Sequence, residues 1–152
     1  MDITRVHQAI SDAVNAAALQ PGALQVTATP FMPLHPTVPH FYPFSWRINY
    51  DRTFGGAEGT PSGMNELLTT WHLCLSLSAD EAGHEEATTI AGSGEETIRD
   101  VILSTRGGPG EYALSGAAED VRLVSASGPN LVNISETTQL LVIEFPIQAI
   151  GR

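Results

Sequence analysis

The chain of 152 residues contains no lysine, so its only permanently basic side chains are seven arginines. Seventeen aspartates and glutamates outnumber them and give a formal net charge of −10. Nucleic-acid binding through the phosphates requires a basic patch, and this charge balance argues against one. The balance does not exclude a surface past which DNA moves without binding, because like charges repel.

Cysteine is nearly absent as well, because Cys74 is the only one. An internal disulfide is therefore excluded, and the place of Cys74 on an expected strand predicts a packed, unreactive thiol. No apolar run approaches the ~20 residues that a membrane-spanning helix needs. The N-terminus lacks a basic segment followed by an apolar stretch, so we expect no secretion signal and a soluble protein made inside a cell.

A chain of this length is expected to form one domain, residues 1–152, with a core that needs no covalent crosslinks. From Val6 to Ala17, apolar residues recur at helical spacing behind Asp2, which can cap a helix. From residue 71 to 77, apolar side chains alternate with smaller or more polar ones, which predicts a strand with one buried face. The strands expected along the chain are 24–29, 45–50, 66–78, 121–127 and 133–150.

Two helices are expected after the strand at 66–78, over residues 80–91 and 93–105. Ser78 and Ser93 each stand three residues before a glutamate, the spacing of a capping box, and Gly92 and Gly94 are expected to separate the helices. The expected order is therefore α-β-β-β-α-α-β-β. Because the helices are grouped, this order predicts an α+β fold: a mostly antiparallel, mixed sheet with helices packed on one face.

Prolines and glycines mark the connections. Residues 128–130 are expected to form a turn, and Pro146 is expected at a sheet edge or bulge because it cannot donate a hydrogen bond. Prolines recur every third residue within 30–43, which favours a stiff connector across one end of the sheet; a ligand for a proline-reading domain is the alternative. The glycine-rich loop 51–66 is expected to be functional, and the lack of lysine argues against a phosphate-binding loop there.

Neighbouring carboxylates occur at 80–81, 85–86, 95–96 and 119–120. A pair formed by Glu81 and His84 could carry out acid–base chemistry, but a solvated acidic first helical turn, favoured by the helix dipole, is the preferred interpretation. There is no Gly-x-Ser-x-Gly motif, and His72 with Cys74 does not complete a metal site. We therefore expect no catalytic group, no metal and no cofactor.

Four short stretches resemble the tail terminator (minor tail) proteins of bacteriophages with long, non-contractile tails. Residues 50–55, Tyr-Asp-Arg-Thr-Phe-Gly, resemble a Tyr-Asp-x-Thr-Phe segment of that family. Residues 80–85 resemble its Asp-x-Ala-Gly-Gln stretch, with His84 in place of the glutamine, and residues 92–98 resemble the start of its next helix. Asp120 to Arg122, followed by a long last strand, fits its C-terminal end, so the resemblance spans about residues 24–150.

The resemblance implies a non-enzymatic structural protein of the virion tail, made in the host cytoplasm. Six copies would form a ring that caps the head-proximal end of the tail tube, ends its growth and offers a docking surface. The implied partners are other copies of the chain, the tail tube protein and the head–tail connector or neck proteins, with DNA only as passing cargo and no membrane. The candidate residues for the ring surface are Tyr50, Asp51, Arg52, Phe54, Glu58, Asp80, Glu81, Glu85, Glu86 and Arg106.

Three other functions stay open at this point. Another neck or tail-completion subunit would share the assembly chemistry. A peptide-binding regulatory module would use residues 30–43 or an exposed strand edge. A small enzyme would need the carboxylates to converge in a pocket.

Overall fold

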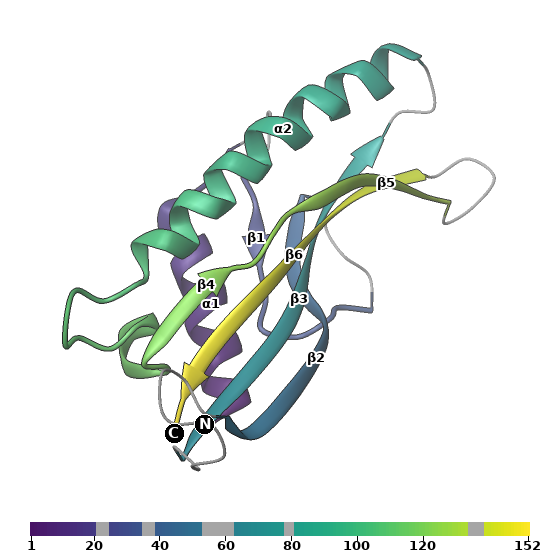
Figure 1. The fold of residues 1–152 in the computed structure, drawn as a ribbon. Coiled ribbons are helices and arrows are strands. Elements are labelled where there is room, and N and C mark those ends of the chain that lie inside the picture. The colour runs from purple at the N-terminus through teal and green to yellow at the C-terminus, as the bar shows by residue number, and fades with distance from the viewer. Residues whose placement is uncertain (21–24, 35–38, 53–62, 78–80, 134–138) are drawn as a thin grey trace.

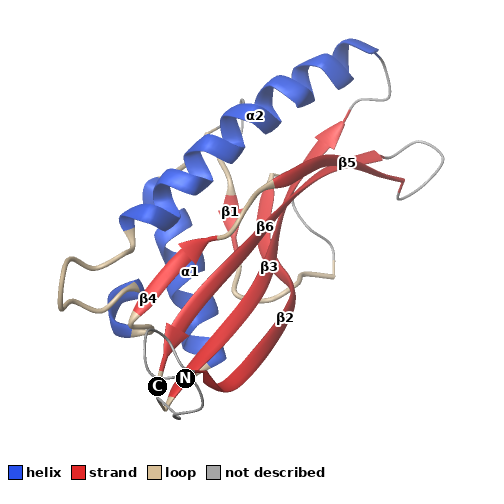
Figure 2. Cartoon of the chain, in the orientation of Figure 1, coloured by secondary structure: helices blue, strands red, loops and turns tan. Residues whose placement is uncertain are grey.

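A computed structural model describes residues 1–20, 25–34, 39–52, 63–77, 81–133 and 139–152, and for some residues of the helices and strands it describes the backbone alone. Two helices, α1 (Ile3–Ala17) and α2 (Glu81–Ser104), pack on a six-stranded sheet, as Figures 1 and 2 show. The strands are β1 (Thr27–Ala28), β2 (His40–Arg52), β3 (Met64–Leu77), β4 (Asp120–Leu123), β5 (Ser127–Asn133) and β6 (Gln139–Gly151). The predicted α+β fold with a mixed, mostly antiparallel sheet is confirmed.

The sheet order is β1-β2-β3-β6-β4, and β5 also pairs with β6. The short β1 runs parallel to β2, and every other pairing is antiparallel. The last two strands, β5 and β4, follow one another along the same side of β6. A single-turn helix, η1 (Leu114–Gly116), lies between α2 and β4. Among the described residues, no helix is long and apolar enough to cross a membrane.

The alternation seen in the sequence places the core on one face of the sheet. Trp71 and Leu73 of β3 stand opposite Phe145 and Ile143 of β6, and all four are buried. Phe41 of β2 stacks on Trp71 with ring centroids 4.7 Å apart. The helices cover this face with the apolar stripe of α1 and with Ala91, Ile98 and Ile102 of α2.

Helix α1 has the cap and the buried apolar stripe that its sequence predicts. The Asp2 side chain accepts a hydrogen bond from the backbone N–H of Arg5 at 3.2 Å, which is the predicted cap. Val6, Ile10 and Val14 are fully buried. Because these residues share one helical face, their burial holds α1 against the sheet.

The predicted break between two helices at Gly92 and Gly94 is wrong, because α2 is one helix of 24 residues. Each glycine weakens a helix by about 1 kcal/mol relative to alanine. The apolar stripe nevertheless continues across them from Ala91 to Ile98 at a spacing of seven residues, and both residues are buried. Burial on both sides of the glycines therefore offsets their local preference.

The predicted turn at residues 128–130 is also wrong, because these residues belong to β5. The pairing with β6 shifts register between Ser127 and Asn130, and Gly128 has a φ of 129°. Glycine and proline therefore mark a bulge within a strand. The connection from β5 to β6 lies outside the described residues.

Pro146 was predicted at an edge or a bulge, but it lies in the central strand β6, opposite Thr70 of β3. On its other side, β4 ends at Leu123 and β5 begins at Ser127. The carbonyl of Pro146 accepts a hydrogen bond from the Val124 N–H there, at 2.9 Å. Because N and O of one residue point to the same side of an antiparallel strand, the missing donor falls in the gap between β4 and β5.

The remaining expected boundaries change modestly. The strand expected at 24–29 is reduced to Thr27 and Ala28, and Leu24 lies outside the described residues. β2 begins at His40, inside the proline-rich segment, and its pairing with β3 shifts register between Pro43 and Ser45. Three predicted features reach outside the described residues. They are the proline-rich segment at 35–38, the glycine-rich loop at 53–62 and the first capping box at 78–80.

The continuity of α2 gives a test. Replacing Gly92 by alanine is expected to raise the free energy of unfolding by about 0.5–1 kcal/mol, because the residue is exposed, helical and has no atom within 4 Å of an added Cβ. Gly128→Ala is the control with the opposite sign, since its Cβ would lie 2.9 Å from the Val142 carbonyl oxygen. Urea unfolding of both variants measures the effects, and a destabilised Gly92→Ala variant would contradict a continuous helix.

Candidate assembly surface

The predicted surface residues occupy separate parts of the fold. Tyr50 lies near the end of β2 with 69% of its surface exposed. Asp51 and Arg52 complete that strand, and their backbone alone is described. Phe54 and Glu58 lie outside the described residues.

The other predicted residues follow α2. Glu81 begins the helix, and Glu85 is exposed on its second turn. Asp80 lies outside the described residues, as do the side chains of Glu81 and Glu86. About 30 Å of helix separates Glu85 from the C-terminal end of α2, which Arg106 follows, so these residues do not form one site.

Arg106 is held by an ion-pair cluster at the end of the sheet. Its Nε lies 3.2 Å from Asp120, and the Nε of Arg122 lies 3.0 Å from the other oxygen of the same carboxylate. Partial burial raises the pKa of Asp120, but hydrogen bonds from Arg122, the Val121 backbone and Arg106 outweigh it and lower the pKa below its usual value. Arg106 therefore anchors the chain after α2 to β4.

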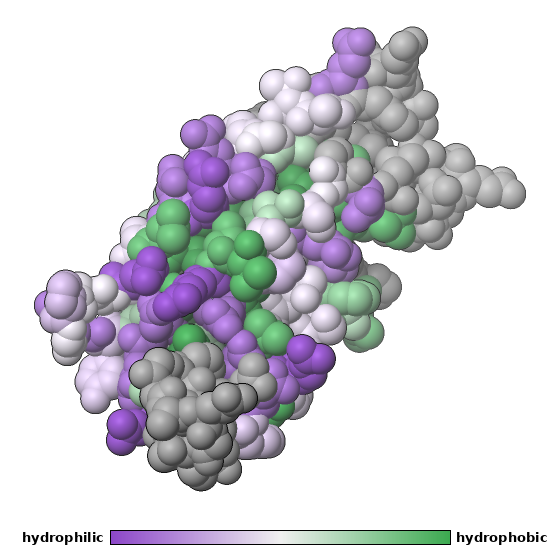
Figure 3. Space-filling view, viewed as in Figure 1, coloured by the Kyte–Doolittle hydropathy of each residue, from purple (hydrophilic) through white to green (hydrophobic). Residues whose placement is uncertain are grey.

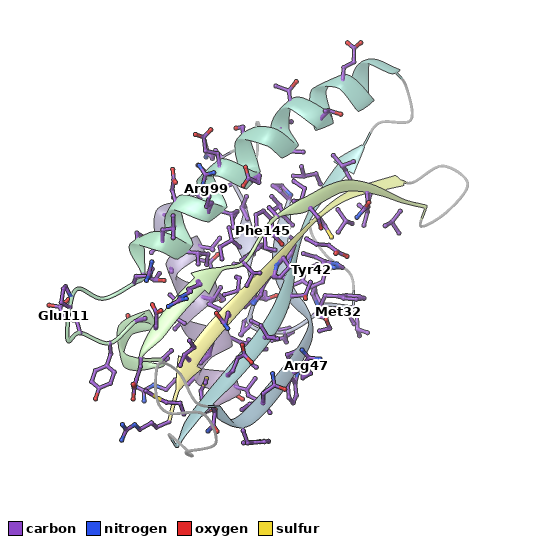
Figure 4. All side chains as sticks on the ribbon, viewed as in Figure 1. Met32, Tyr42, Arg47, Arg99, Glu111 and Phe145 are labelled. Atoms are coloured by element: carbon purple, nitrogen blue, oxygen red, sulfur yellow. The ribbon has the colours of Figure 1, made fainter. Side chains whose placement is uncertain are left out.

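The exposed side of α2 is acidic. Glu85, Glu96 and Asp100 are exposed, and Glu95 is partly buried. Arg99 is the one basic residue of the helix and lies between Glu96 at 4.0 Å and Asp100 at 3.9 Å. Figure 3 shows hydrophilic residues gathered along α2, and Figure 4 shows Arg99 projecting away from the sheet.

Exposed apolar side chains gather in a different place, around β2 and the connector before it. Ten large apolar residues of the described chain are more than a third exposed, and six of them fall between residues 31 and 50. Such a concentration of exposed apolar residues in one segment marks an interaction region more often than scattered residues do, although Phe44 lies beside His72 on the face opposite the helices and Trp46 lies on the helix-covered face. The six are Phe31, Met32, Leu34, Phe44, Trp46 and Tyr50.

This apolar surface coincides with an open edge of the sheet. β1 pairs only with His40 and Phe41 of β2, so no described strand lies beside β2 from Tyr42 onward. The alternation of Trp46, Ile48 and Tyr50 correctly indicated a strand, but periodicity could not show that the strand is at an edge. We call β2 from Tyr42 to Arg52 the open edge.

A second apolar cluster lies on the sheet face opposite the helices, and only the packing of Cys74 in it was predicted from the sequence. Tyr42, Cys74, Leu140 and Val142 form it, each at most 8% exposed. The Tyr42 hydroxyl lies 3.2 Å from the Cys74 sulfur, and burial raises the pKa of both groups. The expected packed, unreactive role of Cys74 agrees with this burial.

His72 lies beside that cluster. Its ring stacks on Phe44 with centroids 4.2 Å apart, and its Nε2 lies 3.4 Å from a carboxylate oxygen of Glu144. Burial lowers the pKa of His72, whereas the Glu144 carboxylate acts in the opposite direction and the net shift is downward. His72 and Cys74 share a face, as expected, and no group of three metal-binding side chains occurs among the described residues.

Two of the open grooves that the described residues line have room for a small molecule. One, of about 410 Å³, lies along α1 beside Thr105 and η1 and carries Arg5 and Asp12. The other, of about 430 Å³, lies between α2 and the start of β5 and carries Glu95. Neither brings a carboxylate beside a histidine, and the side chains of the expected Glu81–His84 pair lie outside the described residues.

His7 is sealed between α1 and the sheet. It is 6% exposed, bonded to the Thr69 hydroxyl at 3.0 Å, and edge-on to the Trp71 ring. Burial lowers its pKa from 6.5 to about 4. The neutral ring therefore serves the packing of α1 and is inaccessible to a substrate.

This burial predicts a pH dependence of stability. Above pH 6.5 His7 is neutral in both the folded and unfolded chain and contributes nothing; as the pH falls toward 4, only the unfolded chain gains the proton, so stability falls. The loss is expected to reach at most about 2 kcal/mol between pH 7 and pH 5. Urea unfolding of the wild type and of His7→Gln measures it, and equal pH slopes in the two proteins would contradict the prediction.

Comparison with known proteins gives no family assignment. No family model matches the chain, and no curated protein is similar to it. The function therefore has to be argued from the residues and the geometry described above.

Proposed function

We propose that the chain is a structural assembly subunit, and that it acts as a tail terminator: a ring of copies that caps the head-proximal end of a phage tail tube. The observation that carries the proposal is the separation of two surfaces. The apolar open edge of β2 lies at one edge of the sheet, and an acidic helix face lies along α2. The first has the chemistry of a protein contact, and the second that of a surface that remains solvated.

A ring requires one surface of each subunit to meet a different surface of the next. The open edge, with Trp46 and Tyr50 more than half exposed, supplies one such surface. Aromatic side chains are enriched in protein interfaces because they bury a large area at a small entropic cost. The predicted residue Tyr50 belongs to this surface.

The acidic face suits a ring through which DNA passes. The chain has a net charge of −10, and Glu85 and Glu96 are exposed on α2. Carboxylates repel phosphates, so DNA would slide past such a face without being held. Tube growth would end because one ring face matches the tube end and the other does not accept another tube subunit. The neck proteins would dock on that second face.

A second candidate is a peptide-binding or partner-binding module. Its support is the connector between β1 and β2, where Phe31, Met32 and Leu34 are 62%, 57% and 95% exposed. Capture of a host protein by a peptide of residues 30–43, lost on replacing these three residues by serine, would favour this function over the ring.

Electron microscopy of tails assembled with and without the protein tests the main proposal. Tails of uncontrolled length in its absence, and six-fold rings at the head-proximal end in its presence, are the expected results. Tails of unchanged length in its absence would refute the terminator function.

The acidic face has its own test. Glu85→Arg is expected to leave the free energy of unfolding within about 0.5 kcal/mol of wild type, because the side chain is exposed, and to impair ring assembly or DNA passage. Asp12→Arg, the same charge reversal at an exposed residue of α1, is the control. Wild-type tail length and infectivity in Glu85→Arg would count against a role for the acidic face.

A further inference from the structure

The open edge has few of the devices by which natural proteins prevent strand pairing. An edge strand presents unpaired backbone N–H and C=O groups, and proteins commonly block them with lysine, proline or bulges. The chain has no lysine, and the register shifts of β2 lie at the two ends of the open edge, at Pro43–Ser45 and at Asn49–Arg52, with the exposed Arg47 between them. From Ser45 to Asn49 the pairing of β2 with β3 is regular, so the free side of this stretch is regular as well.

The side chains along this stretch form a stripe on the helix-covered face of the sheet. Trp46 stands opposite Thr69, and Ile48 stands opposite Leu67, which belongs to the core. Tyr50 comes two residues after Ile48, at the start of the register shift between Asn49 and Arg52, and the period of two continued from Ile48 puts it on this face. Trp46 is 56% and Tyr50 69% exposed, whereas Ile48 is partly buried. The stripe therefore reads aromatic, isoleucine, aromatic, with both aromatic residues open to a partner.

We propose that two copies of the chain pair along their open edges, β2 against β2, antiparallel and with the two-fold axis at Ile48. This register places Trp46 of each copy opposite Tyr50 of the other, and Ile48 opposite its own counterpart. Cross-strand aromatic and β-branched pairs of this kind stabilise a sheet. The sheets of the two copies then join into one, and the exposed aromatic stripe is covered.

The symmetry of the sequence is the reason to choose a second copy as the occupant. A two-fold contact brings residues at equal distances from the axis opposite each other, so the segment has to be complementary to its own reversal. Trp46-Arg47-Ile48-Asn49-Tyr50 meets this condition on the aromatic face. On the other face Arg47 meets the neutral Asn49, whereas an axis at Arg47 would place two guanidinium groups opposite each other, which is unfavourable.

The proposed dimer uses the same open edge of β2 as the proposed ring contact, so one copy of the chain cannot take part in both at once. The inference does not depend on the tail function, because it needs only the open edge and its side chains. A two-fold contact is also closed, since each copy has no second open edge of this composition among its described strands. The expected state of the free protein is therefore a dimer.

Disulfide crosslinking tests the register. In an antiparallel pair, residues directly opposite have Cα atoms about 4.5–5.5 Å apart, within the range of a disulfide. Ile48→Cys is therefore expected to crosslink to its counterpart under mild oxidation. Arg47→Cys is the matched control, because the two copies of residue 47 would lie about 8 Å apart, too far for a disulfide. The native Cys74 is 1% exposed and should not interfere.

Sedimentation equilibrium gives a second measurement that does not depend on an introduced cysteine. Tyr50→Lys is expected to raise the dimer dissociation constant roughly tenfold, because both copies lose an aromatic pair and gain a charge at the edge. Tyr112→Lys is the control, since Tyr112 is 67% exposed and lies in the segment between α2 and β4. Far-UV circular dichroism checks that each variant is folded.

Three results would overturn the inference. The first is a wild-type protein that stays monomeric at all concentrations, and the second is a dimer that Ile48→Cys does not crosslink. The third is a free six-membered ring, which would overturn the dimer while supporting the tail function. Unchanged tails in the absence of the protein would instead refute the tail function and leave the dimer standing, so the two failures are distinguishable.

Discussion

The pairing of β3 with β6 is the interaction on which the rest of the structure depends. The two strands run antiparallel along their whole length, from Asn65 opposite Gly151 to Leu77 opposite Gln139. Their shared period of two sends one set of side chains, including Trp71 and Phe145, under the helices. A slip of one residue would expose this set, so the register also fixes where α1 and α2 can pack.

The elements with a regular apolar period could be predicted from the sequence, whereas the structure around glycine and proline could not. The apolar stripe of α1 and the alternation around Trp71 each result from burial of one face, and burial of one face produces a period that is visible in the local sequence. Glycine and proline report local preference only. Gly92 lies within a continuous helix because the apolar residues around it are buried by tertiary packing, and Pro146 lies in a central strand because two shorter strands leave a gap opposite its nitrogen.

The candidate surface shows the same division. Tyr50 was proposed from the sequence because it lies in the segment 50–55 that carries the resemblance, and the structure shows that it is exposed. The exposure of Trp46 and the lack of a described strand beside most of β2 were not predicted, since an edge strand and a central strand can share one pattern of alternation. Sheet order depends on contacts between distant segments, such as β3 with β6, and neither composition nor spacing records those contacts.

Because of the gap opposite Pro146, the two edges of the sheet differ in how well they could pair with an added strand. On the β2 side, one strand offers an unbroken row of backbone groups from Ser45 to Asn49. On the other side the row is divided between β4 and β5, and β5 is further distorted by a bulge at Gly128. A strand from another chain could not pair continuously with an edge that is divided between β4 and β5. Strand addition there would therefore stop within a few residues. The fold thus permits joining through the sheet while disfavouring the endless stacking of strands that leads to fibres.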